Sequence, residues 1–582
     1  MKNLIQLLFF LVISFKLSAQ DNFIKIIVPE KDTVISYSST YRLSASTLPE
    51  SKVTINGDEF KVYSSGVFAG VVNVNSGINI YKVISENSIG TVEKEFVIIK
   101  KDYSLKSTIA DSLIIENSLM LPNKDLWLTA GDILEVRIKG TPKCKAFFMN
   151  GIEMRELNTD ESPQGIEGVY VGRYKVTSID EREEQSVKFY IVQDNDTVYA
   201  ESKVKVAFMN KNIPIIAKTK DERSELNYGL GENRLGGAKL SFIHEDIKLM
   251  IDGKIGDMYR VKLTDNQSAY IPTDQVELLP YGSRTPNSLT ETITVRGEGK
   301  YDIINVGINE KLPFSSYQEP SEKKIYINIY GATSNTNWIT QYPSVKEIKY
   351  IYYNQIEKDL MRITVELNHK QLWGYSINYV KGSLQIKIKH QPEDLDLEDL
   401  KIVIDAGHGG PTNNGAMGST GLTEKEVNLS TALHLKKFLE EEGAEVIMTR
   451  EKDTSIWNSV RLKKAIDEEP DLLISLHSNS IGLTTDPTKT SGTSTYYKHI
   501  AFRPLSVSIF KRMLELGLKP YGNVGNFNFT LNSQTEMPNT LVELAFMSNP
   551  EDEILLMNDD FRKEMAEKIV EGIEDFLDWC ED

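Results

Sequence analysis

The chain of 582 residues is too long for a single hydrophobic core, and we expect it to fold as about three to five domains. Its 66 Lys and Arg residues against 83 Asp and Glu residues give a formal net charge of −17 at pH 7. Such a charge repels polyanions, and the chain lacks the basic stripe that nucleic-acid binders need. We therefore expect no nucleic acid among its partners.

The first twenty residues, MKNLIQLLFFLVISFKLSAQ, predict a secretory signal peptide over 1–20. They combine Lys2 with an apolar stretch and end in small residues. A short membrane anchor is the alternative, but Gln6 and Lys16 interrupt the stretch, which is shorter than the ~20 residues of a membrane span. No later segment has the composition of a span. We expect an exported chain without stable membrane insertion after signal cleavage.

The two cysteines, Cys144 and Cys580, fall in segments that we assign to different domains. A stabilising disulfide framework is therefore excluded, and we expect buried or incidental thiols.

The segment after the signal peptide predicts two β-sandwich domains, over 21–104 and 105–212. Short strands such as KVTIN, INIYKVI and KEFVIIK alternate apolar and polar residues between Gly, Asn and Ser turns. The piece SSGVFAGVVNVNSGINIYKVISENSIG resembles bacterial immunoglobulin-like (Ig-like) modules.

Residues 213–282 predict very short strands around several glycines, as in ENRLGGAKLSF and IGDMYRVKLTDNQSAYIPTDQVELL. This pattern is similar to bacterial SH3-like barrels, which hold many exported enzymes near cell-wall polymer. A spacer barrel without a ligand is an equal alternative, because Tyr259 and Tyr270 suit a core as well as a binding platform.

Residues 283–392 predict a further β domain, with the strands ETITVRG, KIYINIYG, EIKYIYYN and LQIKIKH. It resembles the wall-targeting β domains found ahead of certain amidases. Tyr350, Tyr352 and Tyr353 fit a packed strand face, with sugar stacking as the alternative. The acidic stretch QPEDLDLEDL then predicts a linker.

After residue 400 strands and helices alternate, which predicts an α/β domain over 400–582 with helices on both faces of the sheet. The first helix should end at Gly443. Its predicted buried face consists of Leu429, Ala432, Leu433 and Leu439. Other expected helices lie at about 459–467, 501–516 and 561–579, and the expected strands are KIVIDA, AEVIMT, DLLISL, GTSTYY, FNFTL and TLVELAF.

Four polar residues stand where these elements begin or end. His408 follows KIVIDA on a glycine-rich loop, which leaves its imidazole accessible. His477 ends DLLISLHSN, Glu424 opens the first helix and Glu543 lies inside TLVELAF. Because ligands gather at the carboxyl ends of strands in such sheets, these side chains should meet at one edge. Two imidazoles and one carboxylate around an open position are typical of catalytic zinc.

Each of these residues also has a structural alternative. A single histidine after a strand is usually a hydrogen-bonded turn residue. Glu424 would complement the helix dipole beside a capping Thr423. Glu543 is harder to explain in this way, because a charge inside an apolar strand is costly unless it is paired or functional. Together with the glycine loop, the four residues favour the functional interpretation.

The motifs IVIDAGHGG, GLTEKEVNL, VIMTR, LLISLHSN, GTSTYY and LVELAFMSNP, in this order, resemble those of the zinc-dependent N-acetylmuramoyl-L-alanine amidases of bacterial cell separation. The resemblance runs from about residue 401 to 579. It implies that His408, Glu424 and His477 hold one zinc ion and that Glu543 is the catalytic carboxylate.

The neighbouring Glu426 is then a solvated helix residue, because the family's spacing to VNL selects Glu424. Leu476 and Ala406 differ from the residues common in the family, but neither is a ligand. Arg450 and Asn479 stand near the same strand ends, where they would either orient ligands and substrate or serve the fold alone.

The resemblance implies hydrolysis of the amide between N-acetylmuramic acid and L-alanine in peptidoglycan, during wall remodelling, turnover or daughter-cell separation. Zinc would activate water, with Glu543 as general base and acid. Peptidoglycan is then the partner, in the periplasm or cell wall, and a protein activator is left open. The interval between His477 and Glu543 leaves little room for the inhibitory helix of some family members, so we predict a constitutively open site.

Two other functions are left as alternatives. An inactive wall-binding scaffold would normally have lost a ligand or the carboxylate, and none is lost here. A zinc peptidase would cut within the stem peptide, but HEDIK at 244–248 lacks the second histidine of an HExxH helix. A Ser or Cys hydrolase is disfavoured, since no GxSxG elbow is present and neither cysteine adjoins a histidine motif.

Overall fold

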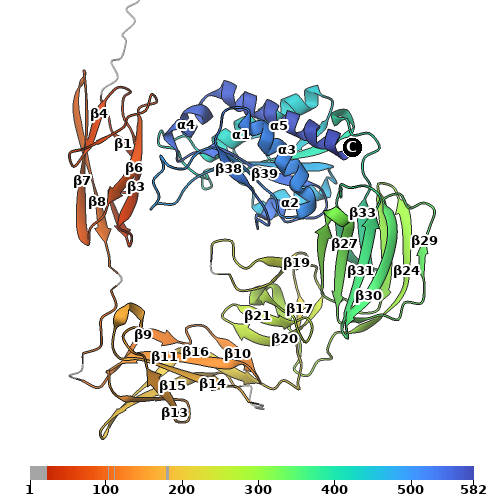
Figure 1. The fold of residues 1–582 in the computed structure, drawn as a ribbon, viewed down its shortest axis with the longest axis horizontal. Coiled ribbons are helices and arrows are strands. Elements are labelled where there is room, and N and C mark those ends of the chain that lie inside the picture. Colours follow the sequence, from red (N-terminus) through yellow and green to blue (C-terminus); the bar gives the residue numbers. More distant parts are fainter. Residues whose placement is uncertain (1–21, 103, 110–111, 178–182, 232, 582) are drawn as a thin grey trace, which may run out of the picture.

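The computed structural model describes residues 22–581 except 103, 110–111, 178–182 and 232. The predicted signal peptide lies outside the described residues. A long β-rich region precedes a C-terminal α/β domain, as predicted. Figure 1 shows the β-rich region forming an arc that brings its first part, in red, back beside the α/β domain, in blue. Within the described residues, the helices are too short or too polar to cross a membrane.

The first part of the arc is a pair of sheets packed around Leu43, Phe68 and Phe96. Strands β7 and β8 bury alternate residues, which is the period of a strand with one face in a core. The first sheet has the order β1 (Lys25–Val28), β3 (Thr40–Ser46), β6 (Val67–Asn73). The second has the order β2 (Thr33–Ser36), β8 (Gly90–Lys100), β7 (Gly77–Asn87), β4 (Lys52–Ile55), β5 (Asp58–Phe60).

A 15-stranded sheet spans the next part of the chain and is continuous through the pairing of β10 with β20. Its first strands are β9 (Ile115–Leu121), β10 (Leu126–Thr129), β11 (Ile133–Gly140), β12 (Lys145–Phe148), β13 (Ile152–Glu156), β14 (Val169–Lys175), β15 (Gln185–Gln193) and β16 (Asp196–Met209). Its later strands are β17 (Ile215–Thr219), β18 (Ser224–Asn227), β19 (Lys239–Ile243), β20 (Lys248–Ile255), β21 (Met258–Lys262), β22 (Ser268–Pro272) and β23 (Val276–Leu278).

Two sheets follow and share one core with the strands from β17 onward. Tyr353 packs on this core and donates to the Thr336 carbonyl, whereas Tyr350 is exposed. One sheet contains β24 (Ser288–Glu298), β25 (Tyr301–Ile308), β28 (Ala332–Thr333), β29 (Ile339–Gln341), β32 (Tyr375–Val380) and β33 (Ser383–Lys389). The other contains β26 (Phe314–Glu319), β27 (Lys324–Tyr330), β30 (Ile348–Glu357) and β31 (Leu360–Leu367).

The α/β domain has one sheet of order β35 (Glu445–Met448), β34 (Lys401–Ala406), β36 (Leu472–Asn479), β39 (Asn539–Phe546), β37 (Thr493–Tyr496), β38 (Pro520–Val524). Its first four strands are parallel and most of their residues are buried, because helices cover both faces. The helices are α1 (Glu424–Glu441), α2 (Asn458–Asp467), α3 (Arg503–Leu514), α4 (Pro550–Met557) and α5 (Asp559–Glu581). Helices α1, α3 and α5 pack together, whereas α2 packs on Val403 and Leu473.

Three details of the predicted α/β domain are wrong. Leu433 is 42% exposed, because α1 turns Val427 and Leu435 toward the core together with the predicted Ala432 and Leu439. The segment FNFTL is not a strand, since the edge strand is β38 and Phe529 turns toward His477. Helix α4 was not anticipated, although Asn549 caps it with two hydrogen bonds.

Two other predictions concern the cysteines and the linker before the α/β domain. Cys144 and Cys580 are both free thiols, half-buried and buried respectively, as predicted. The linker QPEDLDLEDL joins the domains, but it is not a solvated spacer, because Leu395, Leu397 and Leu400 pack into the core of the α/β domain.

Candidate metal centre

The carboxyl ends of the central parallel strands bring the predicted site residues to one place. His408 lies on the loop after β34, and Glu424 is the first residue of α1. His477 lies in β36 directly beside Glu543 of the adjacent strand β39. Because paired residues of neighbouring strands project from the same face of a sheet, their side chains emerge together.

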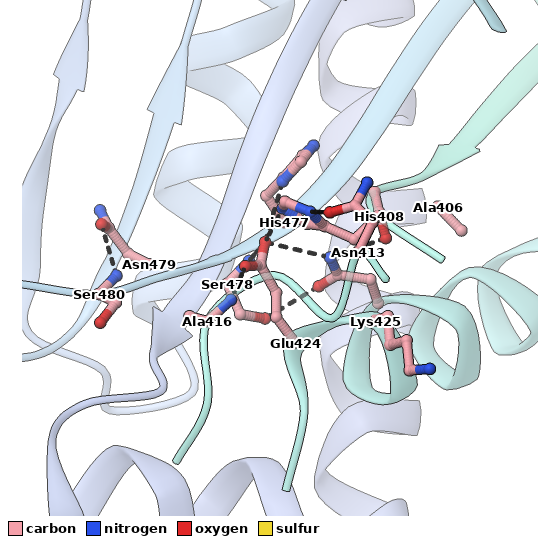
Figure 2. Close-up of polar contacts among 12 residues, drawn as sticks. Ala406, His408, Asn413, Ala416, Glu424, Lys425, His477, Ser478, Asn479 and Ser480 are labelled. Atoms are coloured by element: carbon pink, nitrogen blue, oxygen red, sulfur yellow. Dashed lines mark hydrogen bonds and ion pairs between the residues drawn. The ribbon is translucent and has the colours of Figure 1, made fainter. Parts of the chain in front are cut away.

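Three of these side chains converge on one point, as Figure 2 shows. Glu424 Oε1 lies 3.1 Å from His408 Nε2 and 2.9 Å from His477 Nδ1. The two imidazole rings stand nearly perpendicular, at 78°, with centroids 5.0 Å apart. One nitrogen or oxygen atom from each residue lies within 4.8 Å of the other two, in the arrangement of a shared ligand set.

Backbone and amide groups fix the carboxylate of Glu424. The amide of Ala416 donates to Oε2 at 2.7 Å, and the amide of Ser478 donates to Oε1 at 3.1 Å. Asn428 Nδ2 adds a contact of 3.3 Å to Oε1. Burial alone would raise the pKa of Glu424, but the hydrogen bonds and charges of the two histidines outweigh it and lower the pKa far below its usual range. Glu424 is therefore an anion in the folded protein.

The imidazole of His408 is oriented from its other side by Asn413. Asn413 Oδ1 lies 2.7 Å from His408 Nδ1, so Nδ1 carries the proton and Nε2 is left for Glu424 or a metal. His408 has a left-handed backbone, with φ of 62°, which turns the ring toward the site. Burial lowers the pKa of His408, but the bond and charge of Glu424 outweigh this effect and leave the pKa raised.

The three residues fit a zinc ion in both chemistry and spacing. Imidazole nitrogen and carboxylate oxygen are the ligands of open catalytic zinc sites. Atoms bound at about 2.0–2.1 Å to one tetrahedral ion lie roughly 3.3 Å apart. The distances of 2.9 and 3.1 Å from Glu424 to the two histidines therefore need only a small expansion.

Glu543 differs from Glu424 in accepting no hydrogen bond at Oε2 from the part of the chain that the structure describes. Its side chain is buried. Burial and then the charge of Glu424 raise the pKa of Glu543 well above its usual value, while the charge of Arg234 opposes them. Arg234 belongs to the loop between β18 and β19, so the β-rich region reaches toward this carboxylate.

Two buried arginines, Arg450 and Arg461, stabilise the glycine loop around His408 and the strand before it. Arg450 donates to the carbonyls of Ala406 and Gly407 at 2.8 and 2.9 Å. Arg461 forms an ion pair of 2.8 Å with Asp405, which is fully buried in β34. Arg450 thus positions the loop without touching the candidate ligands. Asn479 lies farther out, with its amide group 3.4 Å from the Tyr496 hydroxyl.

Several residues of the site were not predicted from the sequence. Asn413 and Asn428 follow no spacing rule that would identify them as partners of the ligands. Phe529 stacks on the ring of His477 with centroids 6.4 Å apart, although its segment was expected to be a strand. Glu426, predicted as a solvated residue, is exposed and also accepts hydrogen bonds from the amide and hydroxyl of Thr423, which closes a capping box at the start of α1.

Comparisons with known proteins agree with this geometry. Residues 402–575 match the Amidase_3 family, described as N-acetylmuramoyl-L-alanine amidase. The probable cell wall amidase LytH of Staphylococcus saprophyticus is 30% identical over 265 residues, which is 45% of this chain and 87% of that protein.

Two other similar proteins each match about a third of the chain. The uncharacterized protein YqiI of Bacillus subtilis is 33% identical over 186 residues, 31% of this chain and 87% of that protein. Among solved structures, the catalytic domain of the amidase CwlV from Bacillus (Paenibacillus) polymyxa is 34% identical, with a TM-score of 0.29, over 31% of this chain and 98% of that chain.

Proposed function

The chain belongs to the Amidase_3 family of N-acetylmuramoyl-L-alanine amidases, and from this premise we propose that His408, Glu424 and His477 hold one zinc ion beside the catalytic carboxylate Glu543. The enzyme is an N-acetylmuramoyl-L-alanine amidase, EC 3.5.1.28, that acts on peptidoglycan. The observation that carries the proposal is the convergence of two imidazoles on one oxygen of Glu424, directly beside a buried carboxylate that has no described partner.

In the proposed reaction, water cleaves the amide between N-acetylmuramic acid and L-alanine. Zinc, when bound, supplies an activated water and a Lewis acid for the scissile carbonyl. Glu543 accepts a proton from the attacking water and returns it to the departing amine of L-alanine. The raised pKa of Glu543 suits this role, because a carboxyl group that both takes and gives a proton works best with a pKa near the working pH.

The remaining residues of the site prepare these groups. Glu424 stays ionised as a ligand while burial raises the pKa of Glu543 nearby, because Glu424 receives backbone hydrogen bonds and histidine contacts that Glu543 lacks among the described residues. Asn413 holds the proton of His408 on Nδ1, which directs Nε2 toward the metal.

We also propose the setting in which the enzyme works. A signal peptide over 1–20 would export the chain to the periplasm or cell wall. An Ig-like domain over 21–104, a second β-sandwich over 105–212, an SH3-like barrel over 213–282 and a wall-targeting domain over 283–392 would hold the catalytic domain, 400–582, on its polymer. The site would be constitutively open, so purified enzyme would need no protein activator.

The reaction is tested by digestion of purified peptidoglycan with the full chain, followed by mass spectrometry of the soluble fragments. We expect free stem peptides that begin with L-alanine, with loss of activity on chelation and recovery on addition of Zn²⁺. Stem peptides shortened from within would identify a peptidase instead. Intact linkages despite one zinc ion per folded chain would identify a wall-binding scaffold.

A further inference from the structure

A cavity of about 1080 Å³ lies where the barrel-like strands, the sheets of residues 288–389 and the catalytic domain meet. Arg223 and Lys239 line it from the side of β18 and β19, and Lys498 lines it from the segment after β37. None of these residues belongs to the reaction proposed above. The cavity therefore needs an explanation of its own.

Lys498 is a half-buried cation that has no anionic partner among the described residues. Its ammonium group donates to Asn526 Oδ1 at 2.9 Å and Asn528 Oδ1 at 2.7 Å, and no carboxylate of the described residues forms an ion pair with it. Burial and the positive charge of Lys239 lower the pKa of Lys498 to about 8, so the group is still charged at neutral pH. A partly desolvated cation of this kind is costly unless a ligand supplies the missing charge.

Arg223 is the second cation of this kind in the cavity. Its guanidinium stacks 3.8 Å above the ring of Phe242 and donates to Ser533 Oγ at 2.9 Å, again with no ion pair to a described carboxylate. Burial lowers the pKa of Arg223, and the charges of Glu536 and Glu225 offset only part of this lowering. Lys239, by contrast, forms an ion pair with Glu225. The uncompensated positive charge is thus that of Arg223 and Lys498.

The cavity and the metal centre share a wall. Asn528 and Thr530 line the cavity, while Phe529 between them faces the ring of His477 on the other side. The asparagine contacts of Lys498 therefore anchor the segment that carries Phe529. Arg234, on the loop that joins β18 to β19, brings a further positive charge close enough to act on Glu543. The segment from Asn528 to Thr530 therefore borders both the cavity and the metal centre. Carboxylates such as Glu225 and Glu536 line the cavity as well.

We propose that Lys498 and Arg223 bind a carboxylate of the stem peptide while its amide lies at the metal centre. This proposal rests on the proposed amidase function, since the peptide is the part of that substrate that carries carboxylates. Ammonium and guanidinium groups form charge-assisted hydrogen bonds with such carboxylates. The junction of the β-rich region with the catalytic domain would then select the peptide, in addition to holding the enzyme on the wall.

The test is calorimetric titration of the full protein with a synthetic stem peptide that begins with L-alanine. The same peptide with every carboxylate amidated is the matched ligand. We expect the free carboxylates to improve the affinity about 10- to 100-fold, the value of one or two hydrogen bonds to charged groups. Lys498→Gln should abolish this preference, and Lys498→Arg should keep it. Lys511→Gln, at an exposed position of α3, should leave it unchanged.

Equal affinity for the two peptides, or a preference that survives Lys498→Gln, would overturn the proposal. Because the peptide comparison needs no variant, it stands even if Lys498→Gln does not fold. Binding of inorganic phosphate to the same cavity without binding of the peptide would assign it to a phosphate-bearing polymer and also overturn the proposal. Failure of the amidase reaction is seen separately, in the digestion of peptidoglycan.

Discussion

At the scale of single residues, the site shifts the pKa values of two neighbouring carboxylates in opposite directions. Glu424 receives two backbone amides and two imidazoles, whereas Glu543 is buried without a described partner. Anionic Glu424 in turn disfavours ionisation of Glu543. One carboxylate is thereby suited to bind a cation, and the other to carry a proton.

The buried ion pair of Asp405 with Arg461 predicts acid lability of the catalytic domain. Burial alone would raise the pKa of Asp405, but the charge of Arg461 and two hydroxyl contacts outweigh it and lower the pKa. The stabilisation is therefore complete above the unfolded value of about 3.9 and is lost as pH falls through the lower folded value. We expect Asp405→Asn to cost about 3–5 kcal/mol at pH 7.

The check is the thermal midpoint of wild type and Asp405→Asn from pH 7 down to pH 2. The difference between the two proteins should shrink below about pH 4, because protonated aspartate resembles asparagine. A difference that stays constant across this range would show that Asp405 is not the group responsible.

At the scale of elements, the loop after β34 passes so close to β36 that residue 407 has no room for a side chain. A Cβ built on Gly407 would lie 2.5 Å from Cε1 and Nε2 of His477, so even one methyl group would displace the imidazole. The glycine at this position is thus required by a close approach between the loop and β36.

We expect Gly407→Ala to weaken zinc binding about 10- to 100-fold, the usual result of disturbing a ligand's surroundings. Gly482→Ala is the matched control, because a Cβ there meets no atom within 4 Å. Competition with a chromogenic chelator measures both affinities. Unchanged zinc affinity in Gly407→Ala would mean that His477 does not need this space, or is not a ligand.

Most strands and helices of the catalytic domain were predictable from the sequence, because their apolar runs and amphipathic repeats are long enough to be distinct, but β38 and α4 were not predicted. The proximity of His408, Glu424 and His477, with Glu543 beside His477, was predictable because parallel strands place their carboxyl ends at one edge. The exposure of Leu433 was not predictable. Apolar residues lie around much of this helix, so the sequence alone does not show which of them pack against neighbouring elements.

The contributions of Arg223 and Arg234 were not predictable either. Both belong to the β-rich region, and they reach the catalytic domain only through its packing on β18, β19 and their loop. No local pattern in the sequence records a contact between residues some 300 positions apart.

At the scale of the whole molecule, the first β-rich part returns to the catalytic domain, as Figure 1 shows. Arg42 of β3 is buried there and donates to the Ile481 carbonyl at 2.8 Å, while its amide donates to Leu483. Lys25 reaches the Thr420 carbonyl at 3.1 Å. The first contact lies on the segment that directly follows β36, so the arc fixes a loop next to the candidate ligand His477.

We expect Arg42→Ala to release this loop, because the carbonyl of Ile481 loses a partly buried hydrogen bond from a charged donor, which is worth about 1.5–3 kcal/mol. Limited proteolysis should then cut between residues 480 and 491 at least about 10-fold faster than in wild type. Lys52→Ala, which removes an exposed contact with Glu59, is the control. Equal cleavage rates in all three proteins would show that the first β-rich part does not restrain the loop.

The most direct measurement is the rate at which zinc-loaded Glu543→Gln releases stem peptides from purified peptidoglycan, compared with wild type of equal zinc content. The account predicts one zinc ion per chain in both proteins and a rate about 10²- to 10⁴-fold lower in the variant, because only the proton carrier is lost. Wild-type turnover by zinc-loaded Glu543→Gln would contradict it.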